Sequence, residues 1–167
     1  TARLALGAAG CTLKLVSAVP NQADHSDVDD PGASVAAWNT DPPTSGPHFR
    51  ETAVYGTYDE PLEQARVVHN LEHGAVFIQY GSNVAATEID AIGRFYEAHR
   101  PGTLVAPYPR LKDKIALGAW IAGAGRGQGV LGLCRRFDEE AYGAFLDVFQ
   151  FKGNERFSID SMQPGSN

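Results

Sequence analysis

The sequence has no long stretch of apolar residues and no concentration of positive charge. A bilayer-spanning helix needs about 18 or more uncharged apolar residues in a row, so we expect no transmembrane segment in this chain. Fourteen Lys and Arg residues against 20 Asp and Glu give a net charge of -6, and the basic residues are scattered. Nucleic-acid-binding surfaces are basic patches or stripes, so we expect no nucleic acid partner. The chain starts at Thr1 without an initiator Met, as expected after removal of an upstream signal or anchor, or after trimming.

Cysteine is also scarce, and Cys11 and Cys134 are the only two. They form neither a CxxC pair nor a zinc-ribbon spacing, which argues against a metal site made of both. Two interpretations stay open: one long-range disulfide in an oxidising compartment, or two unrelated buried thiols in the cytosol. A disulfide would tie the N-terminus to the C-terminal half and could contribute roughly 4 kcal/mol by restricting the unfolded chain.

The length fits one domain spanning residues 1–167, with a long loop region near its N-terminus. Residues 20–61 are rich in Pro, Gly, Asp, Asn, Ser and Thr and show little periodicity. Disorder is one interpretation of this composition, but aromatic residues are scattered through the stretch, and disordered segments contain few of them. We therefore predict a long ordered loop packed on the domain. A polar tail is expected over residues 153–167.

Apolar periodicity and capping residues predict three helices. The first covers residues 61–73, with Pro61 at its start and Gly74 as its C-terminal cap. The second covers residues 83–99, and the third follows Asp138, a suitable N-cap.

Strands are expected between these helices. The Gly-rich segment 123–129 has neither the Lys-Ser/Thr of a phosphate loop nor the spacing of a dinucleotide-binding fingerprint, and it predicts a mobile surface loop. Short apolar runs predict strands at residues 13–16, 75–80, 103–106 and 115–121. The pattern as a whole predicts an α+β fold, in which a mixed β-sheet packs with two or three helices.

Two histidines on the first predicted helix form the strongest local signal for chemistry. His69 and His73 are four residues apart, so their imidazoles project from one face and can chelate one metal ion. With Glu72 they form the string His-x-x-Glu-His, which matches an inverted zinc-peptidase motif in which the carboxylate is the base. The alternative is a pair of partly buried structural histidines.

Other histidines could complete the site. His48 ends a stretch with three prolines and a glycine, and such a rigid loop positions a ligand well, although it could equally face water. His25 lies among carboxylates that could orient an imidazole or simply solvate a turn. His99 ends the second predicted helix, where a C-terminal helix charge explains it more simply than ligation.

The choice of metal depends on Met162, the sole methionine, which lies in the polar tail where packing gives no evident reason for it. Thioether ligands select copper, whereas catalytic zinc more often takes histidines with a carboxylate and water. We therefore expect copper as the cofactor, with zinc as the alternative. The opposing interpretation is that Met162 fills a gap under the tail.

Three motifs carry a resemblance to a known family: residues 42–48 (PPTSGPH), Gly56 with Tyr58, and residues 68–74 (VHNLEHG). They resemble the bacterial family known as domain of unknown function 3105, and the similarity spans most of the chain. Its members tend to be secreted or membrane-anchored, so the resemblance implies an oxidising compartment for the cysteine pair but no established activity. Where the family has Gly-x-Pro-Glu, this chain has Gly-Asn-Glu at 153–155, which affects the path of the tail.

These observations favour an extracytoplasmic protein that binds copper through a His cluster. The ligands would be His48, His69 and His73, with His25 or Met162 completing the set. Such a site would serve copper sensing, delivery or buffering. Copper-dependent redox chemistry would use the same ligands with an aromatic residue close to the metal, namely Tyr55, Tyr58 or Trp38.

Two alternatives belong to other classes. A zinc-dependent hydrolase would use Glu72 as general base and an acid such as Glu139 or Glu140 as third ligand. A non-catalytic interaction domain would use its histidines structurally, and metal would not change its stability.

Overall fold

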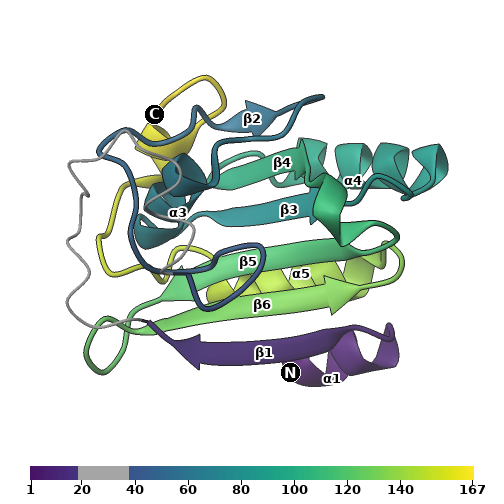
Figure 1. The fold of residues 1–167 in the computed structure, drawn as a ribbon, viewed down its shortest axis with the longest axis horizontal. Helices are drawn as coiled ribbons and strands as arrows, with labels where there is room; N and C mark the ends of the chain where they lie inside the picture. Colours follow the sequence, from purple (N-terminus) through teal and green to yellow (C-terminus); the bar gives the residue numbers. More distant parts are fainter. Residues whose placement is uncertain (19–37) are drawn as a thin grey trace.

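The structure is a computed structural model that describes residues 1–18 and 38–167, in which six strands form one mixed sheet. The strands are β1 (Thr12–Ser17), β2 (Gly56–Thr57), β3 (Val76–Tyr80), β4 (Thr103–Pro107), β5 (Ile115–Ile121) and β6 (Gln128–Cys134). They lie side by side in the order β1-β6-β5-β3-β4-β2 (Figure 1). The pairs from β1 through β3 are antiparallel, whereas β3, β4 and β2 run parallel. The predicted α+β fold with a mixed sheet is confirmed.

Helices and loops cover both faces of this sheet. The helices in the described residues are α1 (Ala2–Ala8), α3 (Gln64–Glu72), α4 (Ala86–Ala98) and α5 (Glu139–Phe149), with 3-10 turns η1 (Pro109–Leu111) and η2 (Ile159–Met162). Because side chains alternate along a strand, Leu117 of β5 packs with α1, α4 and α5 on one face, while Trp120 points to the other. Figure 1 shows α5 behind β5 and β6. The second face packs against α3 and the loops, and it carries the candidate site.

The predicted elements occur with shifted ends. Strands were expected where β1, β3, β4 and β5 lie, and the third helix has Asp138 as its N-cap, accepting a hydrogen bond from the Ala141 amide at 2.9 Å. By contrast, α3 begins at Gln64 rather than Pro61, and α4 begins at Ala86 rather than Asn83. The described residues contain four helices instead of two or three, because the alanine-rich α1 was not predicted.

The surface loop predicted over residues 123–129 ends two residues earlier than expected, because Gln128 and Gly129 already belong to β6. A Cβ on Gly129 would lie 2.3 Å from the Thr44 hydroxyl oxygen. Glycine at this position therefore lets another segment of the chain lie directly on the strand.

A disulfide joins Cys11 to Cys134, linking the residue before β1 to the last residue of β6. Of the two interpretations of the cysteine pair, the structure has the long-range disulfide. Disulfides persist mainly in oxidising compartments, so this bond hints at an extracytoplasmic setting. None of the helices in residues 1–18 and 38–167 combines the length and the apolar character needed to cross a membrane.

Candidate metal centre

A buried loop segment positions His48. Every residue from 42 to 49 is buried, although the stretch is rich in proline and hydroxyl groups. The segment lies on the Gly129 position of β6, and the Trp38 indole N–H donates to the Pro47 carbonyl at 2.9 Å. The proline-fixed backbone thus places the His48 imidazole inside the protein, so this side chain does not face water.

Helix α3 presents three polar side chains to the same place. His69, Glu72 and His73 have the i, i+3, i+4 spacing that puts side chains on one helical face. The buried Asn70 amide accepts a hydrogen bond from the Ala53 N–H at 2.8 Å and donates to the Ala53 carbonyl at 2.9 Å. This pair of bonds fixes the loop that carries His48 against helix α3.

The chain after α5 returns to the end of α3 and adds a second carboxylate. The Glu155 amide donates to the Glu72 carbonyl at 3.0 Å, and the Phe151 amide donates to the Gly74 carbonyl at 2.7 Å. This approach requires glycine, because a Cβ on Gly153 would lie 2.2 Å from the Glu72 carbonyl oxygen. The contact places the Glu155 side chain beside His73.

The first group of possible metal ligands, the inner group, consists of His48, His69 and Glu72, all buried. His48 Nε2 lies 3.0 Å from Glu72 Oε2, and the ring centroids of His48 and His69 are 4.8 Å apart. His48 Nδ1 faces the Gly46 carbonyl at 2.9 Å, and His69 Nδ1 faces the Phe49 carbonyl at 2.8 Å. A carbonyl oxygen can only accept, so both Nδ1 atoms carry hydrogen and each Nε2 faces the cluster.

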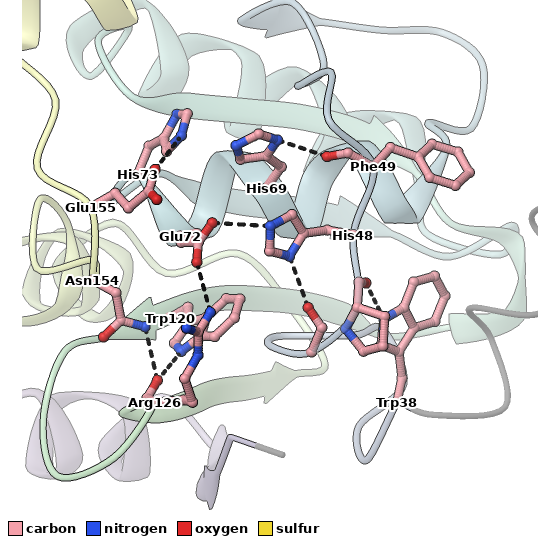
Figure 2. Close-up of polar contacts among 12 residues, drawn as sticks. Trp38, His48, Phe49, His69, Glu72, His73, Trp120, Arg126, Asn154 and Glu155 are labelled. Carbon is pink, nitrogen blue, oxygen red and sulfur yellow. Dashed lines mark hydrogen bonds and ion pairs between the residues drawn. The ribbon is translucent and has the colours of Figure 1, made fainter. Parts of the chain in front are cut away.

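The second group, the outer group, consists of His69, His73 and Glu155. His73 Nε2 lies 3.3 Å from Glu155 Oε2, and the His73 ring stacks on Phe157 at a centroid distance of 3.7 Å. His69 belongs to both groups and lies between the other two imidazoles (Figure 2). The structure therefore distributes His48 and His73 between two adjacent groups that share one histidine.

Glu72 is ionised in the folded protein. Burial raises the pKa of its carboxyl group, but the interactions with His48, His69 and Arg126 outweigh burial and lower the pKa. Arg126, on the loop between β5 and β6, donates to Glu72 Oε1 at 3.1 Å (Figure 2). The carbonyl of Arg126 accepts from Trp120 Nε1 at 2.7 Å and from Asn154 Nδ2 at 2.8 Å, which fixes that loop.

A cavity of about 310 Å³ opens onto the outer group. Its lining includes His69, His73, Phe157 and the fully buried Met162, so the sole methionine lies in the same cavity as two of the predicted histidines. Tyr55 also lines it, and burial raises the pKa of this phenol, so the phenol stays neutral.

The other residues proposed from the sequence lie elsewhere. His25 falls outside the described residues. His99 is the C-cap of α4, with its ring stacked on Phe95 and Nδ1 bonded to the Phe95 carbonyl, which matches its predicted structural role. Glu139 and Glu140 begin α5 on the opposite face of the sheet, so the nearby carboxylate is Glu155 instead.

Sequence reasoning missed Glu155 and Arg126 as parts of the site. The Gly-Asn-Glu string at 153–155 was a signal for the first, since its glycine and glutamate belong to a motif of the resembled family. Nothing in the sequence marked Arg126, which lay in a segment expected to be a mobile loop.

Fold and site together define an α+β protein with a buried His/Glu cluster on one face of a mixed sheet. The chain belongs to the family described as Protein of unknown function (DUF3105), whose model matches residues 31–156. No curated protein matches the chain, and no solved structure does.

Proposed function

We propose that this protein binds one copper ion outside the cytoplasm, with His69 as the central ligand. The observation that carries this proposal is the convergence of His48, His69 and His73, two of which are fixed by backbone carbonyls with Nε2 directed to the cluster. Metal-binding histidines typically have their other ring nitrogen held in this way. A pair of merely structural histidines would not need a third imidazole and two carboxylates around them.

Copper rather than zinc is supported by Met162. Met162 lines the same cavity as His69 and His73, and soft sulfur ligands favour copper. The disulfide supports an oxidising location, because such bonds persist mainly outside the cytosol. Both points suit a protein that stores or delivers copper beyond the cytoplasm.

Copper-dependent redox chemistry is the second form of this proposal. Of the three aromatic residues considered from the sequence, Tyr55 lines the cavity of the outer group. Tyr58 instead donates to the Val54 carbonyl, and the Trp38 indole donates to Pro47. Tyr55 is therefore the side chain that would act beside the metal.

The zinc-hydrolase alternative has less support from the surroundings of Glu72. A general base needs an oxygen directed at a water molecule and a pKa near the working pH. Both Glu72 oxygens instead face basic side chains, Arg126 and His48, and its pKa is lowered. This environment suits a fixed charge or a metal ligand better than a base.

Metal content after competitive loading tests the proposal. Protein purified without chelator or His-tag is loaded with equimolar copper and zinc, desalted and analysed by mass spectrometry. We expect about one copper per chain, loss of copper in His69→Ala, and retention in the control His99→Ala, whose ring stacks on Phe95 at the end of α4. Zinc in place of copper would refute the choice of metal, and the absence of both metals would refute the metal site.

A further inference from the structure

We propose that the single copper ion has two alternative positions, an outer one for capture and an inner one for retention. The outer position is the group His69, His73 and Glu155, and the inner position is the group His48, His69 and Glu72. This inference rests on the proposed copper binding and adds how the ion enters and where it is held.

Each group already has the spacing of metal ligands. Donor atoms about 2 Å from one ion lie roughly 3 Å from each other at tetrahedral or square-planar angles. The His48 Nε2 to Glu72 Oε2 distance is 3.0 Å, and the His73 Nε2 to Glu155 Oε2 distance is 3.3 Å. Each pair is therefore spaced to bind an ion together with His69.

The two positions cannot both be filled through His69. Its Nδ1–H donates to the Phe49 carbonyl, so a metal would be bound through the other ring nitrogen, Nε2. A nitrogen lone pair binds one ion at a time. For the inner position to be occupied, His69 must either release an ion bound in the outer position or stay bound to that ion as it moves inward.

The solvent exposure of the ligands indicates the direction in which the ion moves. His69 and His73 of the outer group line the cavity, and the Glu155 side chain is 49% exposed while His73 is 11% exposed. The inner pair is closed to solvent, with side-chain exposures of 0% for His48 and 2% for Glu72. An ion from solvent meets the outer group first, whereas an ion in the inner group has no direct path to a competing ligand.

The inner position is prepared for a cation before one arrives. The Gly46 carbonyl orients the His48 ring, and Arg126 holds the other oxygen of Glu72. Such contacts behind a ligand fix its geometry. An ion in this position would be bound by His48 Nε2 and Glu72 Oε2, which already lie 3.0 Å apart, and its oxidation state would not change.

Separate measurements of capture and release test the inference. Wild type, His48→Gln, Glu155→Gln and the control His99→Gln are each loaded anaerobically with copper(I), and loading is followed in time. An excess of a chromogenic copper(I) chelator is then added, and the rate of copper loss is measured. Glu155 is exposed, so its substitution leaves the fold intact even if the buried His48 variant fails to fold.

We expect one ion per wild-type chain. His48→Gln should still load one ion but release it about tenfold faster or more, the scale on which even indirect ligand contacts change metal affinity. Glu155→Gln should slow loading by a similar factor and leave release unchanged. Faster release from Glu155→Gln, or two ions per wild-type chain, would overturn the two-position scheme while leaving copper binding intact. Wild type that binds no copper would refute the proposed function itself.

Discussion

Glu72 links two loops of the site to helix α3, because its carboxylate contacts both His48 and Arg126. Its side chain is 2% exposed and faces His48 Nε2 and the Arg126 guanidinium from its two oxygens. Removal of one member of a buried ion pair leaves the remaining charges without compensation. The metal-free protein should therefore depend on this carboxylate for stability.

We predict that Glu72→Gln lowers the free energy of unfolding of the metal-free protein by about 3 kcal/mol at pH 7. This value is at the low end for a broken buried ion pair, because Arg126 is 35% exposed. The pKa of Glu72 is lower in the folded chain than its ordinary value of 4.5, so the stabilisation is full above pH 4.5 and is lost as pH falls through the lower folded value.

Urea unfolding between pH 7 and pH 4 checks this prediction. The difference between wild type and Glu72→Gln should shrink below pH 4.5. The control Glu51→Gln removes an exposed carboxylate paired with Arg66, and it should cost less than about 1 kcal/mol. A difference that stays constant over this range would contradict the lowered pKa.

At the scale of residues, the sequence predicts those site residues whose positions depend on neighbours in the chain. His69 and His73 follow from helical spacing, and His48 follows from the proline-fixed loop that carries it. Glu155 reaches His73 only because a distant segment crosses the end of α3, and no periodicity encodes that contact. For the same reason the sequence pointed to Glu139 and Glu140, which begin a helix on the other face.

At the scale of elements, glycines decide how closely segments approach the site. A Cβ on Gly153 would meet the Glu72 carbonyl oxygen at 2.2 Å and the Gly74 amide at 2.5 Å. Substitution must push the tail away from α3, and the tail carries both Glu155 and Met162. Gly129 has the same role on β6. Because it has no side chain, the buried segment 42–49 can lie directly on the start of this strand.

We predict that Gly153→Ala lowers stability by about 1–3 kcal/mol, the usual cost of overpacking, and weakens copper binding as well. Gly143→Ala is the matched control, because a Cβ at this position in α5 meets nothing within 4 Å and alanine is the better helix former. Thermal unfolding and copper titration of both variants make the comparison. Unchanged copper affinity in Gly153→Ala would show that the tail does not contribute to the site.

In the whole molecule, the disulfide and the His/Glu cluster lie on opposite faces of the sheet. The disulfide between Cys11 and Cys134 packs with α1, α4 and α5 on one face, and the His/Glu cluster lies with α3 on the other. Short apolar runs predicted most strands and the fold class, because each strand has its own pattern. The order of the strands and the face that each loop covers depend on contacts between distant segments, which a linear pattern does not contain.

This separation predicts that loss of the disulfide affects stability but not copper binding. The bond closes a loop with a sequence separation of 123 residues, so the double variant Cys11→Ser/Cys134→Ser should be about 4 kcal/mol less stable. Since β1 still pairs with β6 over six residues, the folded variant keeps the sheet and the site on its other face. Urea unfolding should show the loss of stability, while copper titration in native buffer should give the wild-type affinity. A copper affinity that falls together with stability would mean that the two faces are coupled through the sheet. Gly153→Ala, which acts on the site's own face, should instead lower both quantities.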